Sequence, residues 1–336
     1  MSSPKEMWHA ARHPPADPKH LSFKGKTILV TGANSGLGHA AAIKYAAQGA
    51  SKLILGVRTQ EKGEDAKAAI IRATGCSPEI FIIQTLDLAS FESLQEFATR
   101  VDASVPDLHI LQLSGGVASM EFATSPQGYV VDLQLGAYAF SLIALLLLPK
   151  VRATAQRLVA SGSDDYCYIS FLNSAGSLEV VDDDIPQGQT LIQRIHDQSK
   201  FDARKQYFLL KLAAWYAIRG VAERADGGGD VTKTRVIVNA TCPGMCKTNM
   251  VRNASFLQQM MMSMTWAVFG RSAEEGARTL VGATGQGPEV HKRMWTNDKI
   301  APLSALMQSE RDKELFQQTW DETLAVLRKY VKSDLI

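Results

Sequence analysis

Short apolar runs alternate with longer segments of helical periodicity from residue 26 onward. The runs that we expect to be strands are residues 26–31, 52–57, 79–85, 108–113, 166–172 and 235–240. The helices expected between them are residues 37–48, 60–73, 90–104, 128–151 and 204–224. Alternating strands and helices form βαβ units with parallel strands, and strands of such low polarity are covered by helices on both faces. The sequence therefore predicts an α/β fold with one doubly wound, mostly parallel sheet.

This pattern occupies most of the chain and indicates one large domain. A chain of 336 residues, 46% hydrophobic and 21% charged, can bury a sizeable core. We expect an N-terminal arm over residues 1–24 and the main domain over residues 25–300. Residues 301–336 should form a helical extension packed on that domain, with a surface helix over residues 314–331.

The charge balance favours a small-molecule partner and no nucleic acid. A net charge of +2 supplies no concentrated basic field of the kind that nucleic acid or anionic lipid requires. The longest apolar run, residues 137–149, is shorter than the roughly 20 residues that span a bilayer, so it predicts a buried helix. The first residues lack the order of a signal peptide and the four cysteines are irregularly spaced, which favours a cytoplasmic, reducing location.

A glycine-rich loop, TGANSGLG, follows the first expected strand at residues 31–38 and leads directly into a helix-forming segment. A dinucleotide site needs backbone that turns sharply and lets a pyrophosphate approach without a Cβ in the way. It also needs a helix whose free N–H groups attract the anion. The loop therefore predicts a Rossmann-type dinucleotide site. Its expected cofactor-binding residues are Gly32, Asn34, Ser35, Gly36, Leu37 and Gly38.

The residue after the second expected strand bears on which dinucleotide is bound. An acidic residue there accepts hydrogen bonds from the ribose 2′-OH of NAD(H), whereas an arginine accommodates the 2′-phosphate of NADP(H). This chain has Arg58, and guanidinium groups form bidentate, charge-assisted bonds to phosphate. We therefore expect NADP(H) in preference to NAD(H), although an arginine at a strand end is also an ordinary surface residue.

Tyr207 and Lys211 lie four residues apart in an expected helix, on one face of it. An unperturbed tyrosine has a pKa of about 10, too high for an efficient base near neutral pH. A neighbouring ammonium group stabilises the phenolate and lowers that pKa. Such pairs also arise by chance in helices, but together with the glycine loop this pair predicts a catalytic acid/base.

Four motifs in this order resemble the short-chain dehydrogenase/reductase family. They are the glycine loop, Asp87-Leu88 after the third expected strand, Tyr207 with Lys211, and CPGMCKT at residues 242–248. The resemblance covers residues 25–300. It is closest to the retinol-dehydrogenase-like branch and to enzymes of fungal natural-product pathways.

The resemblance implies roles for the matching residues. Tyr207 would be the general acid/base at the reacting oxygen, and Lys211 would lower its pKa while holding the nicotinamide ribose. In redox members a hydride passes between the nicotinamide and a carbinol or carbonyl carbon. The other cofactor contacts that the resemblance implies are Asp87, Leu88, Ser114, Gly115, Pro243, Gly244 and Thr248.

Three positions depart from the family pattern. Where the family has Asn-Asn-Ala-Gly, residues 113–116 are LSGG, which keeps the small residues and loses the asparagine side chains. The helix asparagine of the family's proton relay falls on Gly136, so a relay there would use water alone or be absent. The substrate-binding serine falls on Asn173 or on the adjacent Ser174, and neighbours on a strand point to opposite sides, so both remain candidates.

These observations favour an NADP(H)-dependent oxidoreductase that interconverts a secondary alcohol and a ketone on a hydrophobic small molecule, in a setting such as secondary metabolism. The altered relay motivates an alternative, a dehydratase, isomerase, epimerase or cyclase that uses Tyr207 as acid/base. A cofactor-binding protein without catalysis is a third hypothesis. The methionine-rich residues 256–266 predict a substrate lid or core packing. Family members pair through long helices, so a homodimer is expected unless the arm or the C-terminal helix blocks that surface.

The sequence predicts no metal site. The histidines lack the spacing of metal ligands, and Cys242 and Cys246 have no second pair or suitably spaced histidine. Asp182, Asp183 and Asp184 could suggest a metal. We expect them instead to be solvated in a loop over residues 177–203.

Overall fold

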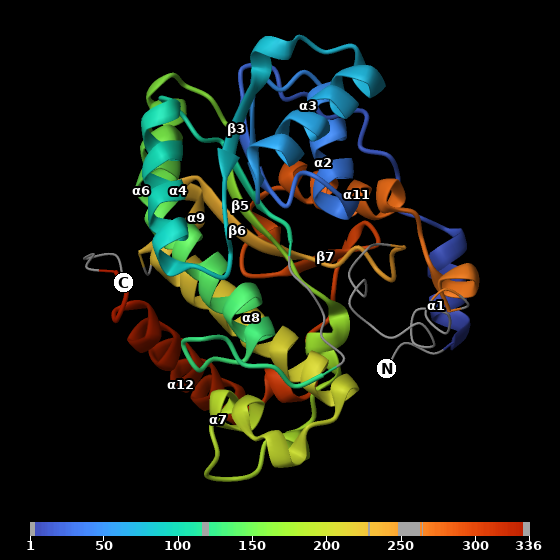
Figure 1. Ribbon diagram of the computed structural model, residues 1–336, viewed down its shortest axis with the longest axis vertical. Helices are drawn as coiled ribbons and strands as arrows, with labels where there is room; N and C mark the ends of the chain where they lie inside the picture. Colours follow the sequence, from blue (N-terminus) through green and yellow to red (C-terminus); the bar gives the residue numbers. More distant parts are fainter. Residues whose placement is uncertain (1–3, 116–120, 228, 248–262, 264, 332–336) are drawn as a thin grey trace.

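The centre of the protein is a single twisted sheet (Figure 1). The structure is a computed structural model that describes residues 4–115, 121–227, 229–247, 263 and 265–331. Within these residues the sheet has eight strands, in the order β3-β2-β1-β4-β5-β6-β7-β8, and β7 and β8 form its antiparallel pair. The strands are β1 Thr27–Thr31, β2 Lys52–Val57, β3 Phe81–Thr85, β4 Ile110–Leu113, β5 Cys167–Leu172, β6 Val236–Thr241, β7 Met294–Thr296 and β8 Lys299–Ile300. The predicted α/β fold with a mostly parallel sheet is confirmed.

Helices cover both faces of the sheet. One layer consists of α2 Gly36–Ala47, α3 Gln60–Thr74 and α11 Ala273–Gly282. The other layer contains α4 Phe91–Ser104, α5 Val131–Leu133, α6 Ala139–Ala160, α8 Ala203–Asp226 and α12 Glu310–Leu327. Figure 1 shows the two layers on opposite sides of the strands. The shorter helices include α1 Pro4–Arg12, α7 Leu191–His196 and α9 Val231–Thr234.

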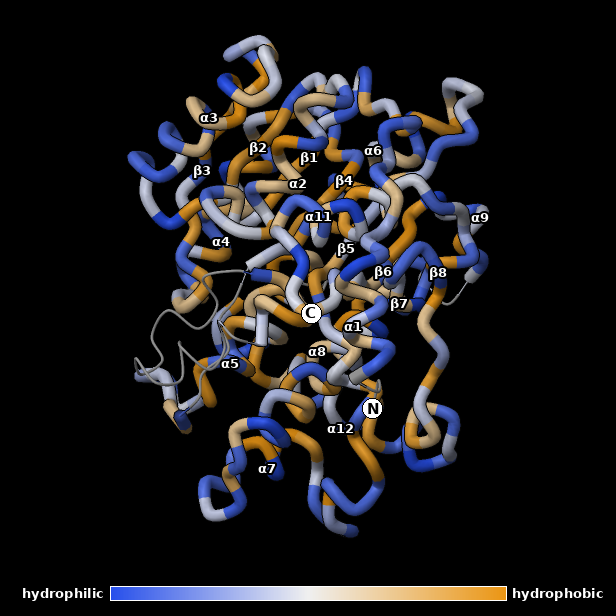
Figure 2. The backbone as a smooth tube through the Cα atoms, turned by 90° about the vertical axis from the view of Figure 1, so that its right-hand side faces the viewer, coloured by the Kyte–Doolittle hydropathy of each residue, from blue (hydrophilic) through white to orange (hydrophobic). Residues whose placement is uncertain are grey.

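Alternate residues of the central strands supply two separate cores. Leu29 of β1 and Ile54 of β2 belong to the core under α4, α6 and α8. Ile28, Val30 and Leu53 belong to the core under α2, α3 and α11. Successive side chains of a strand point to opposite faces, so an apolar strand with helices on both sides fills both cores. Figure 2 shows this concentration of hydrophobic residues along the central strands.

The long apolar segment is a helix of the core. Residues Val131–Ala160 are helical throughout and, by length and composition, could cross a membrane. However, 72% of their most apolar window is buried inside the protein. The prediction of a buried helix for residues 137–149 is therefore confirmed. Its first turns are unusual, because Gln134–Tyr138 form a π-helical segment between α5 and α6.

Some elements differ from the sequence-based expectation. The helix α11 was not predicted. The strands β7 and β8 were not predicted either, because strands of three and two residues carry too little periodicity to detect. The expected loop over residues 177–203 contains α7 and short 3₁₀ turns. Two of its acidic residues are paired with basic side chains, Asp182 with Arg311 at 2.7 Å and Asp184 with Lys205 at 2.9 Å, and Asp183 is exposed as expected.

The C-terminal helix packs on the main domain. It begins at Glu310, earlier than expected, because the Ser309 side chain accepts a hydrogen bond from the Asp312 N–H and caps it. Asp312 accepts hydrogen bonds from Tyr216 at 3.0 Å and from Arg219 at 2.6 Å, both on α8. The helix α12 thus supports the back of α8.

Candidate functional site

The glycine loop leaves β1 where strand order reverses. β1 lies between β2 and β4, and in open α/β sheets ligands bind beyond the carboxyl ends of the strands at such a point. Gly32 has φ +65, and a Cβ there would lie 2.5 Å from the Ser114 carbonyl oxygen. A Cβ on Gly38 would lie 2.5 Å from the Gly32 carbonyl oxygen. Side chains are therefore excluded from both positions.

The start of α2 is free to bind an anion. The helix begins at Gly36, and the Ser35 side chain at its N-cap makes no capping hydrogen bond. Asn34 and Ser35 are exposed. The first N–H groups of a helix have no intrahelical acceptor, and the helix dipole favours negative charge there. These features fit the pyrophosphate of a dinucleotide.

Thr31 and Ser114 tie the ends of β1 and β4 together. The Thr31 hydroxyl donates to the Ser114 carbonyl oxygen at 2.8 Å and accepts from the Ser114 N–H at 2.9 Å. The Ser114 hydroxyl is buried and has no hydrogen-bond partner among the described residues. Gly115 follows with φ +143. The loop after β4 is therefore held next to the glycine loop. The Ser114 hydroxyl is available there for a further hydrogen bond.

The adenine side of the expected site lies beyond β2 and β3. Arg58 is exposed and makes no hydrogen bond or ion pair with the part of the chain that the structure describes. Asp87 is exposed, and its carboxylate accepts from the Ala89 N–H at 3.0 Å. Leu88 reaches toward the loop after β4, because a Cβ on Gly115 would lie 3.6 Å from its Cδ1. The order of the strands thus places the loops after β2, β3 and β4 at the same edge of the sheet, where the parallel strands end.

A serine, a tyrosine and a lysine come together beyond β5 and on α8. The Ser174 side chain lies beside the Tyr207 phenol and favours its ionised form. The Lys211 Nζ lies 5.4 Å from the centroid of the Tyr207 ring. Gly176 packs against this ring, since a Cβ there would lie 3.1 Å from Tyr207 Cε1. Tyr207 and Lys211 therefore lie on one face of α8, as their spacing of four predicts.

Asn173 and Ser174 take different positions. Asn173 is buried, and its Nδ2 donates to the Lys211 carbonyl oxygen at 3.4 Å. Ser174 accepts from the Gly176 N–H at 3.1 Å and contacts Tyr207. Of the two candidates that sequence left open, Ser174 is the one beside the phenol, and Asn173 supports the backbone of α8.

Burial sets the protonation of this group. It raises the pKa of Tyr207 to about 12, and the neighbouring Ser174 side chain only partly opposes this shift. Burial also lowers the pKa of Lys211, while the negative charge of Asp132 favours its charged form. The expected lowering of the Tyr207 pKa by Lys211 is not what the structure has, because burial raises that pKa and the opposing contribution comes from Ser174. The phenol is therefore a proton donor at neutral pH.

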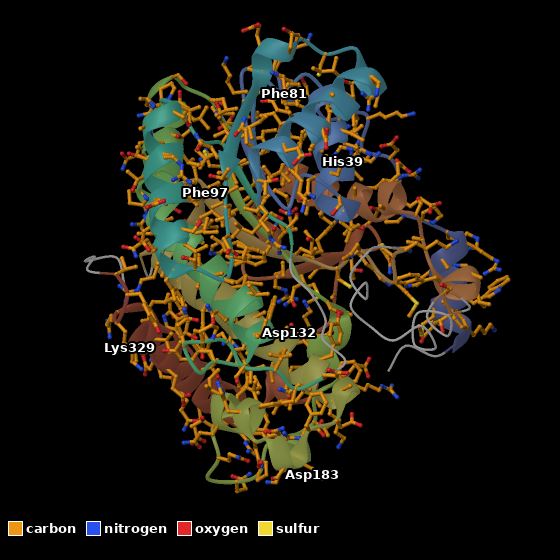
Figure 3. All side chains as sticks on the ribbon, in the orientation of Figure 1. His39, Phe81, Phe97, Asp132, Asp183 and Lys329 are labelled. Atoms are coloured by element: carbon orange, nitrogen blue, oxygen red, sulfur yellow. The ribbon has the colours of Figure 1, made fainter. Side chains whose placement is uncertain are left out.

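Gly136 lies in the π-helical segment Gln134–Tyr138 that packs against α8. A Cβ added to Gly136 would meet nothing within 4 Å, so the position is open space. One turn earlier is Asp132, which Figure 3 labels at the start of the long helical segment. Asp132 shares a cavity of about 10 Å³ with Gln206 and Leu210 of α8. Sequence reasoning missed this carboxylate, four residues before Gly136, whose charge favours the charged form of Lys211.

The turn after β6 contains two of the three residues that we expect at the nicotinamide. Pro243 and Gly244 follow β6, and Gly244 has φ +76. Thr248, Gly116 and residues 256–262 and 264 of the expected lid lie outside the described residues. Arg271, which sequence reasoning also missed, donates from Nη1 to the Pro243 carbonyl oxygen at 3.1 Å. No local pattern could have revealed this contact between distant segments.

Metal ligands do not gather in the described ranges, where no group of three or more His, Cys, Asp or Glu side chains could hold an ion. A larger hollow of about 300 Å³ is lined by residues such as Lys26, Asp165 and Tyr168. It lies near the amino ends of β1 and β5, at the opposite edge of the sheet from the glycine loop.

Comparison with known proteins identifies the family. Short-chain dehydrogenase/reductase ffsI of Aspergillus flavipes is 38% identical to this chain over 328 residues, 98% of this chain and 93% of the relative. The chain belongs to the short-chain dehydrogenase/reductase family. Short-chain dehydrogenase/reductase phmF of Phaeosphaeria nodorum is 34% identical and covers 98% of this chain and 94% of its own length. A family model described as short chain dehydrogenase matches residues 26–132. The resemblance inferred from the four motifs is confirmed.

A solved structure shares the fold of this short-chain dehydrogenase/reductase. L-Sorbose reductase from Gluconobacter frateurii, complexed with NADPH and L-sorbose, has a TM-score of 0.56 at 19% identity. The match covers 77% of this chain and 89% of that one. Short-chain dehydrogenases/reductases bind a nicotinamide cofactor and are oxidoreductases, so this chain is an enzyme of an oxidoreductase family whose glycine loop fits that cofactor.

Proposed function

We propose that this protein is an NADP(H)-dependent oxidoreductase that interconverts a secondary alcohol and a ketone on a hydrophobic small molecule. The observation that carries this proposal is the contact of Ser174 with Tyr207, beside Lys211. Acid/base work at an alcohol or carbonyl oxygen needs a proton carrier, and here it is a tyrosine that a serine can hold in place. We expect the enzyme to act in the cytoplasm and in secondary metabolism.

The cofactor would lie along the carboxyl edge of the sheet. The glycine loop, from Gly32 to Gly38, and the start of α2 would hold its pyrophosphate. Asp87, Leu88, Ser114 and Gly115 would hold the adenosine side. Pro243, Gly244 and Thr248 would line the nicotinamide side, with Lys211 at its ribose. When bound, the nicotinamide supplies a hydride to the carbonyl carbon or accepts one from the carbinol carbon.

The chain's own residues move the proton. In reduction the Tyr207 O–H would donate its proton to the carbonyl oxygen, and in oxidation the phenolate would take a proton from the alcohol. A pKa of about 12 keeps the phenol protonated at neutral pH, which favours reduction. The Ser174 hydroxyl would hold the substrate oxygen next to the phenol. A donor in such a position contributes about 3 kcal/mol to lowering a barrier.

Arg58 supports the choice of NADP(H). It is exposed at the end of β2, at the edge where the adenosine ribose would lie, and has no partner within the described residues. A guanidinium group in this state is available to a 2′-phosphate.

Aromatic and aliphatic side chains line part of a small cavity beside α8. The cavity that contains Asp132 is walled by Phe122, Phe201 and Leu210, and the two phenylalanine rings meet edge to face at 5.8 Å. At about 10 Å³ this cavity has room for one water, and Glu121, Asp132 and Gln206 also line it. The proposal of a hydrophobic substrate therefore rests on the methionine-rich residues 256–266 of the sequence.

Two measurements test the proposal. Fluorescence titration of the purified protein with NADPH and NADH should give tighter binding of NADPH. A panel of apolar ketones should then consume NADPH, with one alcohol formed for each NADPH oxidised. A protein that binds NADPH but transfers hydride to no ketone of the panel, and from no corresponding alcohol, would contradict the redox assignment.

Gly136 favours a second candidate, a non-redox reaction in the same site. It supplies no side chain to a proton relay, and the open space around it leaves the relay to water. Dehydration, isomerisation, epimerisation or cyclisation could use Tyr207 as acid/base without hydride transfer. Product formation with no change in NADPH absorbance would support this candidate, and a one-to-one loss of NADPH would exclude it.

A further inference from the structure

Arg271 is the largest of the nearly inaccessible side chains, with 2% of its surface exposed. Its guanidinium group contacts three segments that are far apart in sequence. Nη1 donates to the Pro243 carbonyl oxygen at 3.1 Å, Nε to the Ala10 carbonyl oxygen at 2.9 Å, and Nη2 to the Asn297 Oδ1 at 2.6 Å. Nη2 also reaches the carbonyl oxygens of Ala10 and His13.

The main chain of Arg271 holds the same turn. Its N–H donates to the Met245 carbonyl oxygen at 2.8 Å, and its carbonyl oxygen accepts from the Lys247 N–H at 2.8 Å. A Cβ on Gly244 would lie 3.1 Å from Arg271 Nη1, so the turn and the guanidinium group fit closely. Arg271 therefore fixes both the course of residues 243–247 and the orientation of the Pro243 carbonyl.

No described carboxylate pairs with this guanidinium group, whose bonds go to carbonyl and amide oxygens. Taking a charge out of water is costly unless its donors are satisfied. An arginine presents five N–H donors in a rigid fork and stays charged, so it can bind several oxygens from different directions at once. A lysine at this position has one nitrogen and cannot reach the same set.

Residues 4–18 of the N-terminal arm are themselves held in place near Arg271. Lys44 of α2 binds Asp17 at 2.8 Å and Glu274 at 2.5 Å. The Ala16 N–H donates to Asp298 Oδ2 at 2.8 Å. Figure 1 shows α1 away from the sheet, beside the orange helical segment of residues 265–269 that precedes α11. The arm is thus a docked element that supplies oxygens to Arg271.

We propose that Arg271 is a positioning residue for the cofactor. The arm and Asn297 hold its guanidinium group, which holds the Pro243–Gly244 turn against the nicotinamide end of the site. The inference rests on the proposed function, because the role of Pro243 and Gly244 at the nicotinamide belongs to it. The arm acts on cofactor binding through Arg271 without touching the cofactor.

The test compares two ligands. NADPH spans the entire site, whereas adenosine 2′,5′-bisphosphate fills only the adenosine side. Arg271→Lys should weaken NADPH binding about tenfold or more in a fluorescence titration and leave binding of the bisphosphate, by calorimetry, within twofold of the unsubstituted protein. General damage to the fold would weaken both ligands.

Arg194→Lys is the matched control. Arg194 is also buried, at 5% exposure, and donates to two carbonyl oxygens, those of Asp184 and Lys200, beside α7. Its replacement should leave both affinities unchanged. Asn297→Gly, a milder change that keeps the positive φ of residue 297, should weaken NADPH about threefold and spare the bisphosphate. Equal loss of both ligands in Arg271→Lys, or unchanged NADPH affinity in both variants, would overturn the proposal.

Hydrogen exchange separates this inference from the proposed function. In the protein without added ligand, Arg271→Lys should speed amide exchange in the peptide over residues 242–247 and leave β1 and β4 unchanged. Unchanged exchange there would overturn the positioning role. An unsubstituted protein that binds neither NADPH nor NADH would overturn the proposed function, even if Arg271 holds the turn.

Discussion

Ser174 and Tyr207 lie side by side, so the loop after β5 and the helix α8 meet at the phenol of Tyr207. The Ala175 N–H, one residue further, donates to Cys242 Sγ at 3.2 Å. The loops after β5 and β6 are therefore joined where the substrate oxygen would lie, and Tyr207 is placed by the sheet as much as by its own helix.

Tyr207→Phe should remove the proton carrier and little else. We expect kcat to fall about 100- to 10,000-fold, the range that a positioned acid or base contributes. The Kd for NADPH should stay within twofold, because the phenol is not needed to hold the dinucleotide. Steady-state kinetics with a turned-over ketone and a fluorescence titration measure the two. A variant that retains more than a tenth of the activity would remove Tyr207 from the reaction.

Asp132→Asn should shift the pH profile. The charge of Asp132 favours the charged form of Lys211, whose pKa burial lowers. Without that charge the pKa of Lys211 falls further, so Lys211 loses its proton at lower pH. The alkaline limb of kcat/KM against pH should therefore move to lower pH. Asp183→Asn is the control, because Asp183 is exposed and lies far from Asp132 in Figure 3. A limb that stays in place or moves up would contradict this coupling.

Gly32→Ala should abolish NADPH binding and destabilise the protein. The new Cβ would lie 2.5 Å from the Ser114 carbonyl oxygen, at φ +65. Gly75→Ala is a matched control, because Gly75 has φ +67 with nothing within 4 Å of a Cβ. The control should cost only the left-handed conformation, about 1–2 kcal/mol in urea unfolding. Equal losses for the two variants would show that the close approach to Ser114 is unimportant.

Arg58→Ala should weaken NADPH and spare NADH. Loss of charge-assisted hydrogen bonds costs about 1.5–3 kcal/mol, which is roughly 10- to 150-fold in Kd. Arg72→Ala, which removes the same charge from an exposed position on α3, should leave both affinities unchanged. The ratio of the two Kd values, measured by fluorescence titration, checks the prediction. A parallel loss of NADPH and NADH would assign Arg58 to general electrostatics.

The hydrophobic pattern of the sequence was sufficient to predict the central strands of the sheet. β1, β2, β5 and β6 are buried over most of their length and are therefore mostly apolar, which makes them visible without tertiary information. β7 was not visible, because its three residues become a strand only by pairing with Ala240 and Thr241 of β6.

Some features of the candidate site could likewise be predicted from the sequence, and others could not. Gly32 and Gly38 could be found because the close approach of backbone tolerates no other residue, and Tyr207 and Lys211 because one helix places them at a spacing of four. The protonation of Tyr207 could not be found, because desolvation depends on what every neighbouring element covers.

Local chemistry and periodicity in the sequence by themselves determined the α/β class, the phosphate loop and the tyrosine–lysine pair, because each depends on residues close together in the chain. Only the tertiary structure decided that Ser174 rather than Asn173 meets Tyr207, that Asp132 acts on Lys211, and that Arg271 joins the N-terminal arm to Pro243. Those contacts join segments far apart in sequence, and the packing of the two helical layers on the sheet sets their distances.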